Sequence, residues 1–299
     1  MTEFNPCEVC GSAQWTPVHT GAVRDGAFGN TLDDGIVAQC GGCGIQRLAE
    51  RCCIPPSYYE TKEYREKLGQ ALDDQSFYCE HDHLHRHALA EVLNLSPRGK
   101  VFADIGCGPG GFADHIAGLV REVWAIEPTE AYQDILRAKG YRSFSYAEDV
   151  PDSETRAELA VSLQVIEHIS DPVGFLRGIH NLLTPDGQVL LTTPNRDDIL
   201  MQLLPTDYRA FFYRVVHRWY FDMASLTKCA EQAGFEVQEM RTVHRYGLSN
   251  AMHWLRDRRP RGGAGLPGLN PALDATWAQH LEAQGFGDTL VAVLRPKAS

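Results

Sequence analysis

The chain has 299 residues, 43% of them apolar, and a formal net charge of −11 at pH 7. This length allows one large domain or a domain with an appendage. The acidic balance argues against a general nucleic-acid binder, because basic side chains that neutralise phosphates supply most of that affinity. No apolar run approaches the length of a membrane span and no secretion signal opens the chain, so we expect a cytoplasmic protein. A small-molecule substrate is therefore favoured.

Two cysteine pairs mark the N-terminal segment. Cys7 and Cys10 form the first C-x-x-C pair, Cys40 and Cys43 form the second, and a glycine follows each pair directly. A turn of this spacing points both thiolates inward, and four thiolates make a closed tetrahedral zinc site. Nine cysteines without an export signal favour thiols and metal ligands over disulfides. We predict a structural Zn²⁺ in a small zinc-ribbon-like domain over residues 1–50, and the alternative is a set of incidental cysteines.

Residues 51–98 are expected to form a helical linker that also serves as a lid over a cofactor. A helix opens at Ser57, after two prolines, and leads through Tyr64 and Arg65. These two side chains are candidates for a wall over the cofactor, and a surface helix packed on the core explains them equally. A second helix is expected from about Phe77 to Leu95.

A glycine-rich turn follows the apolar strand predicted at 101–105. Glycines at four positions of residues 106–111 let the backbone approach a ligand, and the next helix directs its positive N-terminus toward that ligand. The G-x-G-x-x-G spacing, with Glu127 as a ribose-binding acid, also fits a dinucleotide. Asp104 argues against a dinucleotide, since that strand position normally carries an apolar residue. A carboxylate there suits a cationic amino-acid-bearing sulfonium better than a pyrophosphate.

The segment from Asp104 to Gly110, DIGCGPG, resembles the first motif of class I S-adenosylmethionine-dependent methyltransferases. The resemblance extends over residues 97–299 and implies a Rossmann-like, doubly wound α/β domain with a seven-stranded sheet. It implies that Glu127 holds the ribose hydroxyls and that an acid after the next strand meets the adenine amino group. The cofactor-binding residues expected on this basis are Asp104, Gly106, Cys107, Gly108, Gly110, Glu127, Pro128, Glu148, Asp149 and Gln164, with Tyr64 and Arg65 from the lid.

Strands and helices alternate from Lys100 onward, as in a doubly wound parallel sheet. The predicted methyltransferase domain covers residues 99–299, and its last strand is expected to be antiparallel. The predicted strands are 101–105, 122–127, 142–146, 159–165, 187–195, 235–243 and 288–294. The predicted helices include 111–120 and 223–233.

His168 lies in the segment Ile166 to Pro172, which resembles the fourth motif of the same family. The end of a parallel strand lies at the edge where ligands bind. An imidazole titrates near neutral pH, so His168 is a candidate general base for the acceptor. The alternative is a histidine that closes the loop by hydrogen bonds, with methyl transfer driven by alignment of the reactants.

Two long segments, 196–222 and 245–285, are expected to be acceptor-side insertions. The first contains His217 and Tyr220, which are second candidates for proton transfer. Its His-Arg-Trp-Tyr-Phe run loosely resembles deoxysugar C-methyltransferases, which also begin with a zinc-binding region. The second contains a basic cluster from Arg256 to Arg261, which fits either an anionic acceptor or a solvated loop.

The sequence therefore predicts an enzyme that moves a methyl group from S-adenosylmethionine to a small polar metabolite. Candidate acceptors are a sugar, a nucleotide-linked sugar or a natural-product intermediate, and the acceptor atom, its identity and the oligomeric state stay open. The alternatives are an RNA methyltransferase with zinc-finger recognition, an NAD-dependent oxidoreductase, and a non-catalytic module that binds S-adenosylmethionine.

Overall fold

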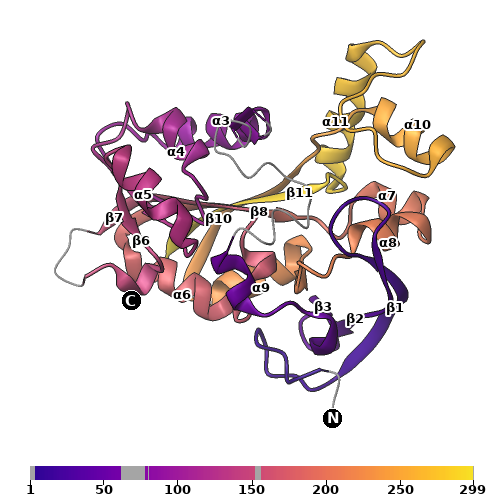
Figure 1. Cartoon of the computed structure of the whole chain (residues 1–299), viewed down its shortest axis with the longest axis horizontal. Coiled ribbons are helices and arrows are strands. Elements are labelled where there is room, and N and C mark those ends of the chain that lie inside the picture. Colours follow the sequence, from indigo (N-terminus) through magenta and orange to yellow (C-terminus); the bar gives the residue numbers. More distant parts are fainter. Residues whose placement is uncertain (1–3, 62–77, 80, 152–155, 299) are drawn as a thin grey trace. The chain divides into compact units, whose positions relative to one another are not determined.

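The computed structural model describes residues 4–61, 78–79, 81–151 and 156–298 (Figure 1). Its contacts divide the chain into two compact units, each built from segments that are distant in the sequence. Unit 1 comprises Met1–Cys53, Thr193–Thr227 and Met240–Val291. Unit 2 comprises Ile54–Thr192, Lys228–Glu239 and Ala292–Ser299.

Unit 1 contains a four-stranded antiparallel sheet of order β1-β2-β3-β9. Its strands are β1 (Trp15–Arg24), β2 (Thr31–Cys40), β3 (Gln46–Leu48) and β9 (Trp219–Tyr220). The long hairpin of β1 and β2 carries two register irregularities, and β3 returns along β2 through the turn that follows Cys40. Strand β9 comes from the predicted 196–222 insertion and pairs with β3 through Gln46 and Tyr220. The N-terminal sheet is therefore completed by residues from the second half of the chain.

Four α-helices lie within the described part of unit 1, and two of them begin at a side-chain N-cap. They are α7 (Ile199–Leu203), α8 (Asp207–Phe212), α10 (Leu248–Asp257) and α11 (Pro271–Gln284). The Asp198 carboxylate accepts a hydrogen bond from the Leu200 amide at the start of α7. Asn270 caps α11 in the same way, and Pro271 occupies its first position.

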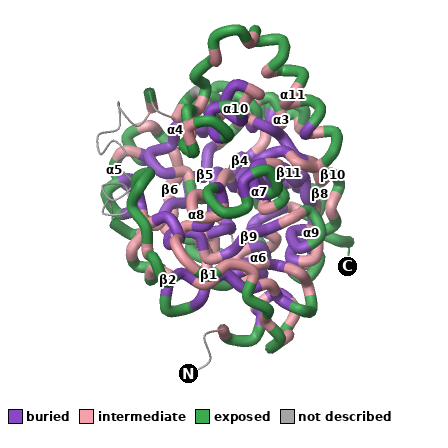
Figure 2. The backbone as a smooth tube through the Cα atoms, turned by 90° about the vertical axis from the view of Figure 1, so that its right-hand side faces the viewer, coloured by how far each residue is buried: buried purple, intermediate pink, exposed green. Residues whose placement is uncertain are grey.

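The second sheet has seven strands in the order β10-β11-β8-β7-β4-β5-β6, which confirms the predicted Rossmann-like architecture. The strands are β4 (Val101–Ile105), β5 (Glu122–Ile126), β6 (Arg142–Phe144), β7 (Ala157–Leu163), β8 (Leu183–Pro194), β10 (Phe235–Val243) and β11 (Thr289–Pro296). The pairs β4–β5, β4–β7, β5–β6 and β7–β8 are parallel. Every residue of β4 is buried, as expected of a central strand covered on both faces (Figure 2).

The helices of unit 2 include α3 (Arg86–Asn94), α4 (Gly111–Ile116), α5 (Glu130–Ala138) and α6 (Pro172–Leu182), and α9 (Met223–Gln232) runs from unit 1 into unit 2. Helices α4, α5 and α6 lie between strands of the parallel sheet in the chain order, and α3 precedes β4. Short 3-10 helices are η1 (Glu50–Cys52), η2 (Pro56–Glu60), η3 (Asp82–His85), η4 (Ala147–Asp149) and η5 (Ile166–His168). No helix among the described residues is both long and apolar enough to cross a membrane.

Three helix predictions need correction within the described residues. The helix after the glycine-rich turn ends at Ile116 and does not reach residue 120. The helix expected to open at Ser57 is a 3-10 helix that ends at Glu60, because Thr61 adopts an extended conformation. The predicted 77–95 helix is interrupted: residues 78, 79 and 81 are helical, the 3-10 turn η3 follows, and α3 begins at Arg86. Tyr64 and Arg65, the predicted lid residues, lie outside the described residues.

Candidate functional site

The glycine-rich loop between β4 and α4 has a backbone that only glycine accommodates easily. Gly106, Gly108 and Gly110 all have positive φ angles, 76°, 54° and 88°. A Cβ atom on Gly106 would also lie 2.4 Å from the Cγ2 atom of Val165, so a side chain is sterically excluded there. The loop therefore offers bare backbone at the carboxyl end of the central strand β4, where ligands of such sheets bind.

Asp104 places a carboxylate at the same strand end and leaves one of its oxygens unused. The side chain is 2% exposed, and within the described part of the chain Oδ2 has no hydrogen-bond partner. Burial, with the nearby Glu127 charge, raises the pKa of Asp104 to about 7. A buried acceptor without a donor is costly, so this oxygen is suited to a ligand that brings a donor or a positive charge.

Glu127, directly after β5, points its carboxylate at the glycine-rich loop. Its Oε2 accepts a hydrogen bond of 2.8 Å from the Gly108 amide, and its Oε1 accepts one of 2.9 Å from the Thr129 amide. The Gln133 side chain donates to the Glu127 carbonyl from helix α5. The half-buried Pro128 follows the acid. The structure thus joins two predicted site residues, Glu127 and Gly108, through a direct hydrogen bond.

The two acids predicted to meet the adenine lie on η4 and face different surroundings. The Asp149 carboxylate accepts from the Tyr146 amide and lines a cavity of about 480 Å³ with residues of α5 and β6. The glycine-rich loop contributes no residue to that cavity. A carboxylate oxygen of Glu148 lies close to Gly178 on α6. Asp149 therefore lies at a cavity wall.

Gln164 has a left-handed backbone, with φ of 59°, at the carboxyl end of β7. Such a conformation is uncommon in a residue with a side chain and is often found at functional sites. Its side-chain amide donates to the Thr192 hydroxyl at 3.3 Å. The next residue, Val165, is the one that approaches Gly106.

His168 ends η5 and contacts Tyr59, a residue that the sequence analysis did not single out. The Tyr59 hydroxyl and His168 Nδ1 are 3.1 Å apart, and the backbone carbonyl of Tyr59 accepts a hydrogen bond from the Thr129 hydroxyl. Tyr59 thereby connects the histidine to the loop after Glu127. Its only sequence signal is its position in an aromatic pair behind two prolines, which gives no indication of the partner.

His217 and Tyr220 belong to unit 1. Tyr220 is 1% exposed, and its hydroxyl accepts a hydrogen bond from the Arg214 amide and donates one to the Arg214 carbonyl. Burial raises the pKa of this phenol well above its ordinary value. Its proton is therefore held by the turn that it closes, and this argues against the predicted part in proton transfer. His217 is buried, and its amide donates to the same carbonyl.

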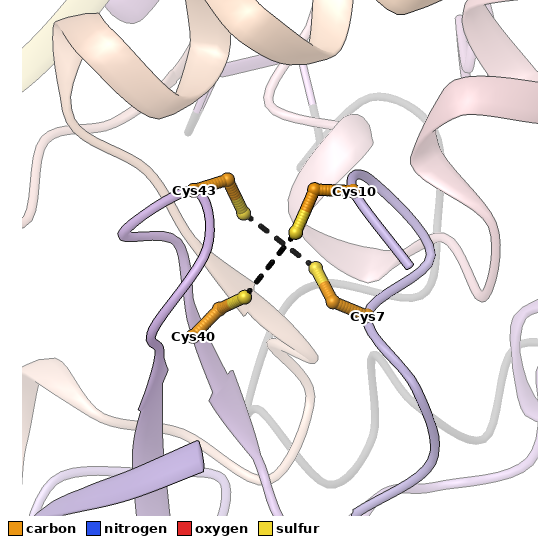
Figure 3. Close-up of side chains that lie close together, drawn as sticks. All are labelled: Cys7, Cys10, Cys40 and Cys43. Carbon is orange, nitrogen blue, oxygen red and sulfur yellow. Dashed lines mark hydrogen bonds between the residues drawn. The ribbon is translucent and has the colours of Figure 1, made fainter. Parts of the chain in front are cut away.

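The four predicted metal ligands, Cys7, Cys10, Cys40 and Cys43, converge in unit 1 (Figure 3). The Sγ atoms of Cys7 and Cys43 are 3.6 Å apart, and those of Cys10 and Cys40 are 3.5 Å apart. Tetrahedral zinc with Zn–S bonds of about 2.3 Å requires sulfur separations of about 3.8 Å. A Cβ atom on Gly42 would lie 2.8 Å from the Cys10 sulfur. The donor set and the spacing therefore fit a closed tetrahedral zinc site.

Comparison with known proteins identifies the region around the glycine-rich loop. A family described as "Methyltransferase domain" matches residues 79–240. A Mycolicibacterium smegmatis protein named as an S-adenosylmethionine-dependent methyltransferase is 31% identical over 191 residues, 62% of this chain and 70% of that protein. A ubiquinone biosynthesis O-methyltransferase from Aeromonas salmonicida is 27% identical over 168 residues, 51% of this chain and 69% of that protein.

One solved structure shares the fold at low sequence identity. It is a chain from the complex between the Haloferax volcanii Trm112 methyltransferase activator and a methyltransferase. The TM-score is 0.52 and the identity 13%, over 74% of this chain and 94% of that chain. This likeness concerns the fold alone.

Proposed function

We propose, because this chain belongs to the family of methyltransferase domains, that it transfers the methyl group of S-adenosylmethionine to a small polar metabolite. The family and its relatives make the chain an S-adenosylmethionine-dependent methyltransferase, which removes the nicotinamide alternative. The acceptor class is our proposal. The net charge of −11 supports a small molecule over RNA, since an RNA enzyme needs basic surface to hold phosphates. A sugar, a nucleotide-linked sugar or a natural-product intermediate fits this polarity.

The observation that carries the cofactor assignment is the unused Oδ2 of Asp104 beside the bare glycine-rich loop. This oxygen would accept from the cationic amino-acid part of the cofactor, and Glu127 would accept from its ribose hydroxyls. We place Asp149 near the adenine because it lines a cavity together with residues of α5, the helix that follows Glu127. When bound, S-adenosylmethionine supplies an electrophilic methyl group on its sulfonium. The chain's own contribution is to bind, orient and exclude water.

We assign proton handling to His168, whose Nδ1 is hydrogen-bonded to the Tyr59 hydroxyl and whose Nε2 lies 3.9 Å from a carboxylate oxygen of Glu167. An imidazole so placed would take a proton from an acceptor group. The bond to Tyr59 equally supports a positioning role, in which His168 closes the loop after β7. His217 is the second candidate, and Tyr220 is set aside because the Arg214 backbone engages its hydroxyl.

We further propose that Cys7, Cys10, Cys40 and Cys43 bind a structural Zn²⁺. Four thiolates occupy all positions of a tetrahedral ion, so such a site has no open position for catalysis. The role of the ion would be to hold the N-terminal turn against the turn between β2 and β3.

Calorimetric titration of the zinc-loaded protein with S-adenosylhomocysteine, with NAD in parallel, tests the cofactor assignment. We expect micromolar binding of S-adenosylhomocysteine and none of NAD, and the reverse result would overturn the proposal. An acceptor screen with tritiated S-adenosylmethionine should then include nucleotide sugars, phenolic metabolites and RNA. Methylation of RNA alone would contradict the small-molecule assignment, and binding without turnover on any acceptor would favour the non-catalytic alternative.

The variant His168→Ala separates the two roles of the histidine once an acceptor is known. A base contributes about 100-fold or more to turnover, and its loss should flatten the acidic limb of the pH–rate profile. Turnover that stays within about threefold of wild type, with S-adenosylhomocysteine still bound, would remove the base role.

A further inference from the structure

Two arginines of unit 1, Arg24 and Arg214, differ from the other arginines around them. Arg47 pairs with Glu8 and Glu50, Arg196 with Asp222, Arg218 with Glu50, and Arg245 with Asp288. Within the described ranges, neither Arg24 nor Arg214 has a carboxylate within ion-pair distance or a hydrogen-bond acceptor for its guanidinium. Arg209 also lacks an acid partner, but its guanidinium donates to the Val18 carbonyl at 3.3 Å. Arg24 and Arg214 are therefore two withdrawn cations with neither an acid nor a hydrogen-bond acceptor among the described residues.

The backbone holds these two residues beside each other. Arg24 ends β1 and forms a parallel bridge with Arg214. The Arg24 amide donates to the Tyr213 carbonyl at 2.8 Å, and the Val215 amide donates to the Arg24 carbonyl at 3.0 Å. Neighbouring extended segments lie about 5 Å apart, so the side chains start from adjacent positions. This pairing brings together residues from the first and last thirds of the chain.

Both guanidinium groups are withdrawn from water. Arg24 is 9% exposed, its Nε is buried without a partner, and its guanidinium carbon lies 4.0 Å from the centre of the Phe211 ring. Arg214 is partly buried, and burial lowers its pKa to about 10. Its electrostatic neighbours are the phenols of Tyr220 and Tyr246 and the charge of Arg245. Arg214 thus stays protonated at neutral pH, and no acid of the described residues lies within ion-pair distance of it.

A withdrawn cation without a counter-charge is costly, and a bound anion removes that cost. Guanidinium offers a planar fork of donors that matches carboxylate and phosphate oxygens. We propose that Arg24 and Arg214 form an oxyanion-binding site of unit 1, for a ligand that carries a phosphate or a carboxylate group.

The exposed basic cluster from Arg256 to Arg261 fits this role less well. Arg256 pairs with Asp257, and Arg258 lies 3.7 Å from Asp207. Both arginines are more than half exposed, so water and their acidic partners already stabilise them. Arg256 therefore provides a matched control, an arginine of the same unit whose charge is already compensated.

Thermal unfolding of the full-length, zinc-loaded protein tests the site with inorganic phosphate and with acetate, each against sodium chloride of equal ionic strength. We expect one of the oxyanions to raise the wild-type Tm by about 3 °C at tens of millimolar. Arg24→Gln and Arg214→Gln should lose this shift, Arg214→Lys should keep part of it, and Arg256→Gln should keep all of it. A larger shift with phosphate indicates a phosphorylated ligand, and a larger shift with acetate indicates a carboxylate.

The Tm in chloride alone separates a binding role from a structural one. If the charge of Arg214 is uncompensated, Arg214→Gln should unfold at or above the wild-type temperature in chloride while losing the oxyanion shift. An oxyanion shift that persists in the Arg24→Gln, Arg214→Gln double variant would overturn the inference. So would a wild type that responds to phosphate and acetate no more than to chloride. If Arg214→Gln does not fold, the oxyanion-induced Tm shifts of Arg214→Lys and Arg24→Gln test the inference instead, and both should be smaller than the shift of wild type.

Titration of the same samples with S-adenosylhomocysteine keeps the two proposals apart. If the protein binds S-adenosylhomocysteine but shows no oxyanion response, the oxyanion-site proposal fails and the cofactor assignment stands. Protein that responds to oxyanions through Arg24 and Arg214 without binding S-adenosylhomocysteine contradicts the cofactor assignment instead.

Discussion

Asp104 of unit 2 and Arg214 of unit 1 carry opposite charges, and each is withdrawn from water without full compensation by the described residues. The first is a buried carboxylate with an oxygen that accepts from no described donor, and the second is a partly buried guanidinium that faces no described acid. Elsewhere in unit 1 the chain compensates its withdrawn charges, as between Arg245 and Asp288 at 2.8 Å. Charges left uncompensated in an otherwise compensated fold mark the positions where we expect ligands to supply the missing partner.

The four cysteines are the largest group of side chains that we expect a ligand, here Zn²⁺, to hold together. Removing one of them should therefore have the largest effect. Cys40→Ser removes one ligand from the turn between β2 and β3. Because zinc binding to four thiolates contributes about 10 kcal/mol or more to folding, we expect loss of stoichiometric zinc and a fall in Tm of more than about 10 °C. Zinc content by mass spectrometry and thermal unfolding by circular dichroism measure both quantities.

Cys53→Ser is the matched control, because Cys53 lies outside the cluster and its thiol donates to the Leu48 and Ala49 carbonyls. A serine hydroxyl can make the same bonds, so zinc and Tm should stay near wild type. Equal damage from both variants, or a Cys40→Ser protein that retains its zinc, would contradict the metal assignment.

Gly106→Ala should damage the cofactor side and leave the oxyanion response of unit 1 intact. The new Cβ would lie 2.4 Å from Val165 at a φ of 76°. The left-handed backbone costs about 1–2 kcal/mol of stability and the overpacking about 1–3 kcal/mol. Relief of this strain displaces the loop from the cofactor, and we expect about a 100-fold loss of S-adenosylhomocysteine affinity. Gly118→Ala is the control, since no atom lies within 4 Å of its Cβ position. Calorimetry that finds equal affinities in the two variants would refute this account.

The sequence alone predicts the features that local spacing determines. The four zinc ligands are two short repeats of one pattern, and Asp104, Gly106 and Gly110 belong to one contiguous motif. The seven strands follow from apolar runs bounded by turn residues, and all seven occur in the structure within a few residues of the predicted ends. In local patterns of this kind, the spacing of the residues along the chain also determines how they are arranged in space.

Features that depend on pairing between distant segments cannot be predicted in this way. No pattern near Arg24 indicates a bridge to Arg214, and no pattern near Gln46 indicates that β9 completes the first sheet. Tyr220 is a reasonable proton-transfer candidate by residue type, but its role depends on the Arg214 backbone that it contacts. Of the helices predicted in the 57–95 region, the first ends early as a 3-10 helix and the second is interrupted by one, because the helical propensity of a segment does not indicate where a 3-10 turn replaces an α-turn.

The variant Asp104→Asn tests, through the pH dependence of stability, whether the buried Asp104 carboxylate is uncompensated. An unfolded aspartate has a pKa of about 3.9, and burial raises the folded pKa of Asp104 to about 7. The folded protein therefore binds more protons between these values, and the stability that Asp104 contributes is present below pH 4 and is lost as the pH rises to about 7. The asparagine side chain cannot ionise, so the variant should be more stable than wild type above pH 7, by about 2–4 kcal/mol.

Urea unfolding of both proteins between pH 5 and 8 measures this difference. Asp198, whose pKa burial and the Asp288 charge also raise to about 7, contributes the same slope to both curves and cancels. Saturating S-adenosylmethionine should restore more stability to wild type than to the variant, because only the carboxylate gains a cationic partner. A difference curve that is flat with pH would mean that Asp104 is not ionising in the folded protein over this range.

Glu127→Gln should have the smallest effect, because the glutamine oxygen still accepts one hydrogen bond. The loss of charge weakens its bonds to ribose hydroxyls, and we expect about a tenfold weaker affinity for S-adenosylhomocysteine by calorimetry. Glu122→Gln is the matched control at the other end of β5, where Glu122 pairs with the partly exposed Arg142. If the two variants lose affinity equally, the effect arises from strand stability and the ribose role fails. If only Glu127→Gln loses affinity, the hydrogen bond that the Gly108 amide now donates to this carboxylate marks the place where ribose binds.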